Sequence, residues 1–175
     1  YGYTPGSDQV ASVTFSGTSS PVTTLKTRDA LHRLEKIETV IQNFNGPPPP
    51  DSPWFSHEYE YQQGQRTKAT LGDGSFWEYR YDNEHEELTS ARKYSNSGSE
   101  ILQGLDFSFV YDDIGNRTSS TVNGRTSSFV PTLLNQYESR TVPGSVDVLG
   151  EAVESAVVTV DPGQVTARRQ GRYYD

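Results

Sequence analysis

The stretch Val110-Tyr111-Asp112-Asp113-Ile114-Gly115-Asn116-Arg117 recurs in several versions along the chain. Tyr79-Arg80-Tyr81-Asp82 repeats its first half, and residues 59–66 are a shorter version. A weaker copy runs through residues 28–34. The shared frame is an aromatic-x-aromatic triplet, an acidic or amide residue, a short turn and a new extended run. Self-similarity of this kind predicts a repeat architecture.

The copies carry aromatic residues at alternate positions. Alternate residues of a strand face the same side, so each copy presents a one-sided aromatic stripe. Polar residues such as Glu60, Arg80 and Ser108 lie between the rings and face the other way. This pattern is typical of half-buried antiparallel strands. The stripes are formed by Tyr59, Tyr61, Trp77, Tyr79, Tyr81, Phe107, Phe109 and Tyr111.

Two dipeptides between the stripes are hairpin signals. Asp73-Gly74 and Asn123-Gly124 suit a two-residue type I′ turn, because both central residues of that turn need a positive φ. We therefore expect residues 67–71 to pair with 75–81, and residues 117–122 to pair with 125–130.

Taken together, the Tyr-Asp copies resemble the YD repeats of bacterial RHS proteins, which are relatives of the shell of insecticidal toxin complexes and of the teneurin barrel. Residues 133–141 are similar to an Asn-Gln-Tyr segment of such proteins, and the resemblance covers residues 1–141. It implies a ribbon of β-hairpins that winds into a hollow shell. In complete family members, that shell encloses a C-terminal toxin or other cargo polypeptide. The residues that match the repeat motif are Tyr59, Tyr61, Gly64, Arg66, Tyr81, Asp82, Tyr111, Asp112, Gly115 and Arg117.

The chain departs from the YD pattern at several positions. Gln62 replaces the aspartate in one copy, and His85 and Glu87 stand where Gly and Arg are usual in the family. Many complete shells carry a self-cleaving Asp-Pro motif. Here Asp161-Pro162 is followed directly by Gly163, so we expect an ordinary turn and not autoproteolysis.

A proline-rich segment divides the chain. Residues 45–53 favour polyproline II and are expected to be a linker or loop between N-terminal YD-like repeats, residues 1–44, and a hairpin region, residues 54–141. Just before the linker, apolar residues recur with helical spacing, whereas the repeat frame calls for strands; we favour strands. These apolar residues are Leu31, Leu34, Ile37, Ile41 and Phe44.

The last segment, residues 142–175, is expected to form short β-strands. Val146-Asp147-Val148, residues 157–160 and Arg172-Tyr173-Tyr174 are the candidates. They resemble the opening of a bacterial immunoglobulin-like module, but too few strands remain to close a sandwich. The predicted fold class is therefore all-β, with stacked antiparallel hairpins of YD-repeat type that form an open, incomplete shell or sheet.

Composition limits the function. The chain has 175 residues, 32% hydrophobic residues, a net charge of −8 and 11 Tyr, 7 Phe and 2 Trp. Clustered Lys and Arg are what bind nucleic acid or anionic lipid, so neither partner is expected. The sequence contains no cysteine and no methionine. No apolar run of the ~20 residues that a bilayer span needs is present. We interpret the chain as an exported segment of a longer protein, located outside the cell or at its surface.

Three functions compete. The first is a structural segment of an RHS/YD-repeat shell that encloses or presents a cargo polypeptide, or that self-associates through its edge strands. The second is a carbohydrate-binding or adhesion module, since exposed rings can stack on sugars. The third is a hydrolase with paired carboxylates, for which the sequence offers Glu60, Asp82 and Asp112. The ligand-binding candidates of the second function are Trp54, Trp77, Tyr79 and Tyr81.

No motif points to a catalytic centre, a metal or a cofactor. His32, His57 and His85 have no metal-ligand spacing among themselves and fit solvated turns. No strained serine elbow, alternating acidic calcium loop or phosphate-binding glycine loop occurs. We therefore expect no catalytic residue, no metal and no cofactor, and consider an enzyme the less favoured interpretation.

Overall fold

The computed structural model describes residues 1–16, 21–41, 55–82, 84–145, 147–160 and 165–174. These residues form strands, turns and bends, and no helix occurs among them. The predicted all-β fold class is confirmed. The expected linker at residues 45–53, Trp54 and the Asp161-Pro162-Gly163 turn lie outside the described residues. In the part of the chain that is described, no helix is long and apolar enough to cross a bilayer.

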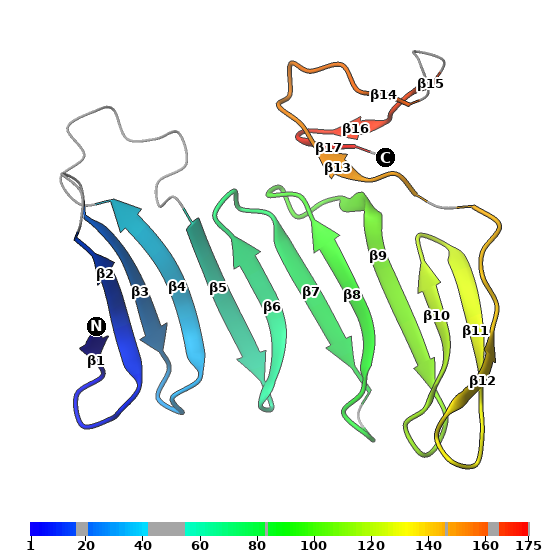
Figure 1. Ribbon diagram of the computed structural model, residues 1–175, viewed down its shortest axis with the longest axis horizontal. Helices are drawn as coiled ribbons and strands as arrows, with labels where there is room; N and C mark the ends of the chain where they lie inside the picture. Colours follow the sequence, from blue (N-terminus) through cyan, green and yellow to red (C-terminus); the bar gives the residue numbers. More distant parts are fainter. Residues whose placement is uncertain (17–20, 42–54, 83, 146, 161–164, 175) are drawn as a thin grey trace. The chain divides into compact units, whose positions relative to one another are not determined.

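The strands pair in the order in which they occur along the chain. One antiparallel sheet of twelve strands has the order β1 to β12, so each strand bonds to its neighbours in sequence (Figure 1). This order is linear, and β1 and β12 each have one neighbour in the sheet, so the predicted open sheet is confirmed. The strands are β1 (Gly2–Tyr3), β2 (Val10–Phe15), β3 (Val22–Arg28), β4 (Leu34–Ile41), β5 (Phe55–Gln62), β6 (Gln65–Leu71), β7 (Phe76–Tyr81), β8 (Leu88–Tyr94), β9 (Ile101–Tyr111), β10 (Arg117–Val122), β11 (Arg125–Pro131) and β12 (Tyr137–Arg140).

The chain divides into two compact units, Tyr1–Trp77 and Glu78–Asp175. In the first unit, β4 takes the segment whose spacing fitted both a helix and a strand, so the strand interpretation is confirmed. Its β-branched residues suit a pleated surface, and Thr24 and Thr39 are joined across β3 and β4 by hydroxyls 2.9 Å apart. Burial alternates along β5, with Tyr59 and Tyr61 half-buried and Glu58 and Glu60 exposed.

The two predicted hairpin signals behave differently. Asn123 and Gly124 both have positive φ, 50° and 78°, as a type I′ turn requires. At Asp73-Gly74 the type I′ prediction is wrong, because only Gly74 has a positive φ, 80°. There the Gly74 amide donates to the carbonyl of Leu71, which makes a longer loop with Gly74 in the left-handed conformation. The two-residue turn that sequence reasoning missed is Gln63-Gly64, with φ values of 50° and 87°.

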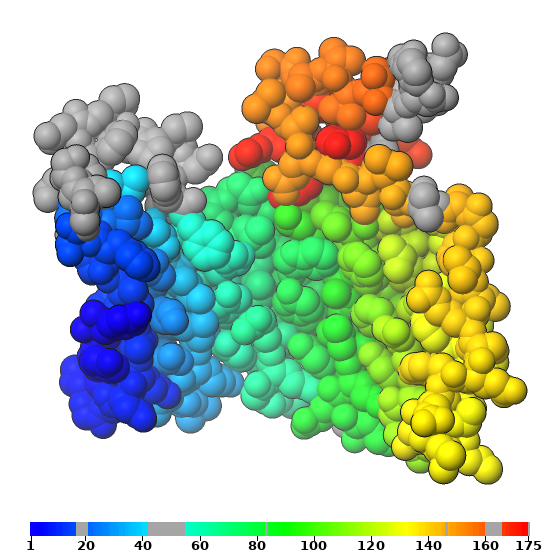
Figure 2. All heavy atoms as spheres, viewed as in Figure 1, coloured from blue at the N-terminus to red at the C-terminus, as the bar shows by residue number. Residues whose placement is uncertain are grey.

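The second unit contains the best-buried side chain. Residues of β9, β10 and β11 share rows across the sheet, such as Phe109 opposite Ser120 and Ser120 opposite Ser127. Figure 2 shows the side chains of β8 to β11 side by side on one face. Leu102 of β9 is 2% exposed and is the largest fully buried side chain among the described residues. Most of the other buried apolar side chains are alanines such as Ala91. The hydrophobic core is therefore thin.

The C-terminal part of the second unit folds against β8 and β9. β13 (Gly150–Glu151), β17 (Tyr173–Tyr174) and β16 (Arg169–Gln170) form a three-stranded sheet, and β14 (Thr159–Val160) pairs with β15 (Val165–Thr166). The buried Lys93 of β8 donates to the Tyr173 hydroxyl at 2.6 Å and lies 4.3 Å from its ring centre.

Part of the strand prediction for this segment is wrong. Asp147 and Val148 lie outside any strand, and Val157 and Val158 precede β14 instead of belonging to it. The Asp147 carboxylate is instead paired with Arg125 and accepts a hydrogen bond from the Asn123 side-chain amide at 2.8 Å. Contacts with the hairpin between β10 and β11 therefore take the place of backbone pairing at this position.

Candidate functional site

Aspartate-capped turns at one end of the strands recur in the structure. The turn between β9 and β10 shows the construction: the Asp112 amide donates to the Asn116 carbonyl at 2.9 Å, and the Gly115 amide donates to the Asp112 carbonyl at 3.0 Å. The Asp112 carboxylate accepts from the backbone amides of Ile114 and Asn116, and from the Asn116 side chain at 3.0 Å. Gly115 has a φ of 86°, which glycine adopts without a steric penalty.

A turn in the first unit has the same construction with different residues. The Asp29 carboxylate accepts from the backbone amides of Leu31 and Arg33, both at 2.9 Å, and pairs with the Arg33 guanidinium at 2.7 Å. Sequence reasoning missed a further version, in which the Thr132 hydroxyl takes the place of the carboxylate and accepts from the amides of Leu134 and Gln136. The sequence signal was a side-chain acceptor five residues before the first residue of the next strand. It was overlooked because the acceptor is a threonine and not an aspartate.

Tyrosines of the repeat join one turn to the next. The Tyr111 hydroxyl donates to the carbonyl of Leu88, the first residue of β8, at 3.1 Å. The Arg117 amide, at the start of β10, donates to the Tyr137 hydroxyl at the same distance. In the first unit the Tyr61 hydroxyl donates to the Leu34 carbonyl at 2.8 Å. In all three cases, a tyrosine hydroxyl binds the backbone of the first residue of a strand, directly after a turn.

Arginines of the repeat lie over other aromatic rings of the sheet. The Arg117 guanidinium carbon lies 4.7 Å from the centre of the Phe129 ring, and that of Arg66 lies 4.1 Å from the Tyr59 ring centre. Cation–π contacts of this kind stabilise a packed layer. The structure therefore gives the repeat-motif residues intramolecular contacts, and their predicted role in the repeat remains a proposal.

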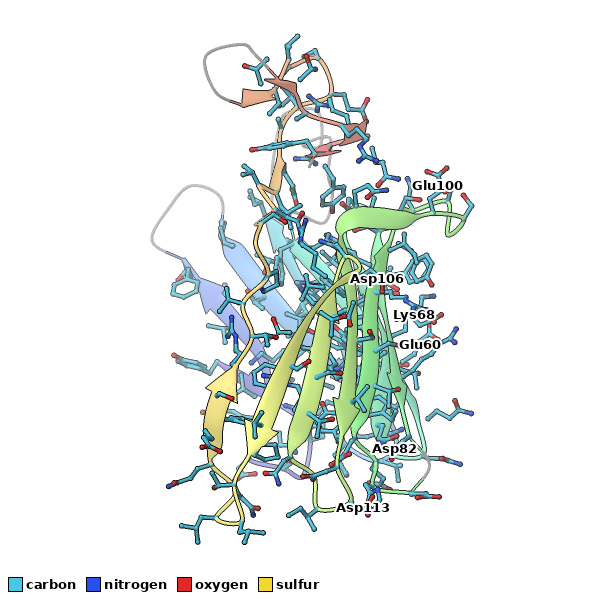
Figure 3. All side chains as sticks on the ribbon, turned by 90° about the vertical axis from the view of Figure 1, so that its right-hand side faces the viewer. Glu60, Lys68, Asp82, Glu100, Asp106 and Asp113 are labelled. Carbon is cyan, nitrogen blue, oxygen red and sulfur yellow. The ribbon has the colours of Figure 1, made fainter. Side chains whose placement is uncertain are left out.

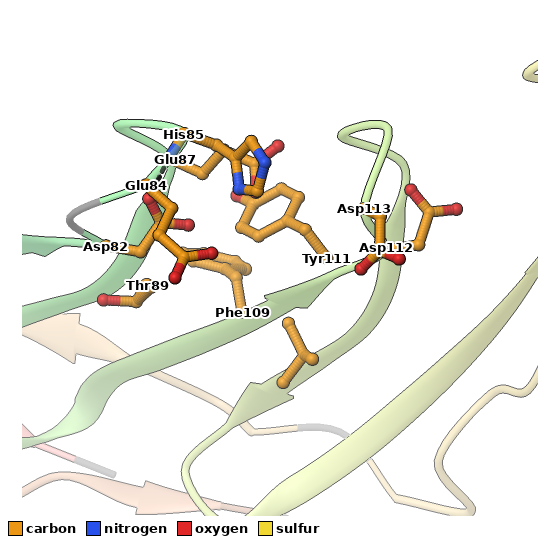
Figure 4. Close-up of a pocket in the computed structure, with 10 residues that line it drawn as sticks. Asp82, Glu84, His85, Glu87, Thr89, Phe109, Tyr111, Asp112 and Asp113 are labelled. Atoms are coloured by element: carbon orange, nitrogen blue, oxygen red, sulfur yellow. Dashed lines mark hydrogen bonds between the residues drawn. The ribbon is translucent and has the colours of Figure 1, made fainter.

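A pocket of about 370 Å³ lies in the second unit between two of these turns. Figure 4 shows Phe109 and Tyr111 between the turn that carries Asp82, Glu84, His85 and Glu87 and the turn that carries Asp112 and Asp113. Figure 3 places Asp82 and Asp113 at the same end of the strands, away from Asp106 and Glu100. The lining residues are Asp82, Glu84, His85, Glu87, Thr89, Phe109, Val110, Tyr111, Asp112 and Asp113.

Electrostatics in the pocket favour ionised carboxylates. A hydrogen bond from the His85 backbone amide, 2.8 Å long, is the main reason that the pKa of Asp82 lies below its usual value. The side-chain hydrogen bond from Asn116 lowers the pKa of Asp112 in the same way. Burial raises the pKa of Tyr111, so its hydroxyl stays protonated and continues to donate to Leu88. The pocket is therefore an acidic cleft with an aromatic wall.

The pocket contains one group of side chains that could hold a metal ion. One ligand atom from each of Asp82, His85 and Glu87 lies within 4.8 Å of the others, and no other such group occurs in the described part of the chain. The sequence predicts no metal site, because it contains no established metal-ligand spacing and its histidines fit solvated turns. The signal that pointed here was the departure from the repeat pattern at His85 and Glu87.

The predicted carbohydrate-binding residues are not among those that line this pocket. Trp77 is half-buried in the first unit, and Tyr79 and Tyr81 are half-buried in the second. Their predicted role remains untested. Of the acidic candidates for hydrolysis, Glu60 pairs with Lys68 at 3.1 Å, and its neighbour Glu58 pairs with Lys36 at 3.1 Å.

No protein-family model matches the chain, and no curated protein matches it. Solved structures do match. The crystal structure of TcdB2-TccC3-TEV matches at 18% identity with a TM-score of 0.47. Those of TcdB2-TccC3-Cdc42 and TcdB2-TccC3 match at 18% and 19% identity, both with a TM-score of 0.44. This chain is similar to a part of these TcdB2-TccC3 structures. Each match covers 82% of this chain and 8% of the matched chain, so this chain spans only a small part of the length of those proteins.

Acid should weaken the turn that Asp112 caps. A carboxylate whose pKa is lower in the folded state stabilises the fold above its unfolded pKa of about 4, and this contribution is lost as the pH falls through the folded pKa. Asp112→Asn should therefore lower the melting temperature at pH 7, and its difference from wild type should shrink on acidification. Asp113→Asn is the matched control, and an equal effect of both substitutions at pH 7 would contradict this role.

Proposed function

We propose that this chain is a segment of an RHS-type shell that encloses or presents a cargo polypeptide at the cell exterior. The observation that carries the proposal is the linear sheet in which tyrosine hydroxyls repeatedly bind the backbone next to a neighbouring turn. The hydroxyls of Tyr61 and Tyr111 donate to a carbonyl, and that of Tyr137 accepts from an amide. A single active site needs no periodic use of one residue type, whereas an extended wall does. A structural role is therefore the best-supported function.

Charge indicates which cargo such a segment would hold. The net charge of −8 favours a basic polypeptide, and acidic side chains gather at the turn ends of β7 to β10 in the second unit. Half-buried tyrosines on the sheet offer apolar ring area. Both features suit an unfolded, cationic chain without a defined sequence.

The test uses the full 175-residue chain and two unfolded probes. Reduced and alkylated ribonuclease A is basic, and reduced and alkylated α-lactalbumin is acidic. We expect saturable binding of the basic probe in fluorescence polarisation, weaker binding at higher salt, and recovery of both probes uncleaved. Failure to bind the basic probe, or equal binding of the acidic one, would contradict the proposal.

The competing functions give other outcomes. Saturable sugar binding on a glycan array that is lost in Trp77→Ala, with folding intact, would support a carbohydrate-binding module instead. Hydrolysis that is lost on Ala substitution of Asp82, Asp112 or Glu60 would support an enzyme. Sedimentation at several protein concentrations would show whether the edge strands β1 and β12 self-associate.

A further inference from the structure

The turn that begins at Asp82 differs from the two other aspartate-capped turns at its closing position. In those turns, the residue whose carbonyl closes the turn also donates a side-chain hydrogen bond to the aspartate: Arg33 to Asp29 and Asn116 to Asp112. In the third turn, the Asp82 amide donates to the carbonyl of Glu87 at 3.0 Å, so the closing residue is a glutamate. The Glu87 carboxylate, which can only accept, thus takes the position at which Arg33 and Asn116 donate in the related turns.

With Glu87 at the closing position, the turn contains two carboxylates, those of Asp82 and Glu87. The related turns contain one carboxylate and one side-chain donor. Two ionised carboxylates within one turn repel each other. The Glu87 carboxylate also lies against Gly115 of the next turn, since one of its oxygens would be 2.9 Å from a Cβ built on that glycine. Asp112 and Asp113 line the same pocket and add negative charge. A bound cation would provide the positive charge that Arg33 provides at Asp29.

His85 determines which cation fits. Its imidazole nitrogen and one oxygen each from Asp82 and Glu87 lie within 4.8 Å of one another. Zinc is bound by imidazole nitrogen and carboxylate oxygen at about 2.0–2.2 Å, so three converging ligands need small side-chain rotations to reach it. Calcium and magnesium prefer oxygen ligands alone, so the histidine selects against them.

We propose that Asp82, His85 and Glu87 bind one divalent transition-metal ion, with Zn²⁺ as the best match. The described part of the turn supplies all three ligands, and Asn83 lies outside it. His85 and Glu84 are exposed at the pocket rim, so the ion can enter from solvent. With three protein ligands, a tetrahedral ion keeps a fourth position open for water or for a side chain of a bound polypeptide.

Calorimetric titration of the full chain with ZnCl₂ tests the proposal. We expect one saturable site, with affinity for CaCl₂ or MgCl₂ at least about 10-fold lower. His85→Ala should weaken zinc binding by about 10-fold or more. His32→Asn is the matched control, because His32 lies in the Asp29 turn with a φ of 61°, which asparagine tolerates. Nuclear magnetic resonance should show zinc shifting the His85 imidazole and leaving His32 and His57 unchanged.

Glu87→Arg separates metal binding from folding. It recreates the pairing of Arg33 with Asp29, so the variant should fold with an unchanged or higher melting temperature and lose zinc binding. Retention of zinc affinity by Glu87→Arg would overturn the proposal. Equal weakening by His85→Ala and His32→Asn would overturn it as well, as would calcium binding as tight as zinc binding.

Discussion

Leu102→Ala is expected to lower the free energy of unfolding by about 2–5 kcal/mol. Leu102 is 2% exposed on β9, and the other buried apolar side chains of the second unit are few and mostly small. Truncation removes buried methyl groups and leaves a cavity that the surrounding structure can fill only in part. Urea denaturation followed by circular dichroism measures the loss.

The matched control for Leu102→Ala is the same substitution at Leu133. That side chain is fully exposed at a turn, so Leu133→Ala should change the free energy of unfolding by less than about 0.5 kcal/mol. Similar losses for the two variants would mean that Leu102 is not part of the core. The urea dependence of ΔG should stay the same in both variants, since the area exposed on unfolding is nearly unchanged.

Arg169→Ala is expected to loosen the packing of the C-terminal strands of the second unit among themselves. The guanidinium donates to four backbone carbonyls, those of Ala152, Val153, Ala156 and Gly171. Hydrogen bonds to a charged group contribute about 1.5–3 kcal/mol each, although water replaces part of this at half-exposed carbonyls. We expect a local destabilisation of about 2–4 kcal/mol, seen as faster hydrogen exchange and faster proteolysis between residues 150 and 174.

Arg168→Ala controls for the loss of charge in that experiment. Arg168 is exposed and adjacent to Arg169, so both variants lose one positive charge at almost the same place. Faster exchange in both variants would show that charge, and not the four carbonyl contacts, holds the segment. Exchange in β10 and β11 should remain at the wild-type rate, because these strands bond to each other through their own ladder.

Sequence reasoning succeeded where the signal was local. Period-two aromatic residues located β5 and β9, and Asn123-Gly124 located a true type I′ turn. The same rule was wrong for the turn type at Asp73-Gly74. The Asp73 carboxylate accepts from the Ser75 amide at 2.9 Å and from its hydroxyl at 2.6 Å, which favours a loop with Asp73 at negative φ.

The candidate site was harder to predict because its contacts cross the sheet. Residues 82–87 could be recognised as a departure from the repeat, but the fit of Glu87 against Gly115 depends on a second hairpin. The contact between Lys93 and Tyr173 joins residues far apart in sequence. Composition and periodicity carry no information about such pairs, so the position of the C-terminal strands could not be derived from the sequence.

Pairing between consecutive strands has a consequence for how such a protein can change length. Each strand forms hydrogen bonds only with the strands before and after it in the sequence. A whole hairpin can therefore be added or removed without changing which of the other strands pair. Contacts between near neighbours in sequence also need little loop closure before they form, which permits ordering of one hairpin after another as the polypeptide emerges from a ribosome or an export channel.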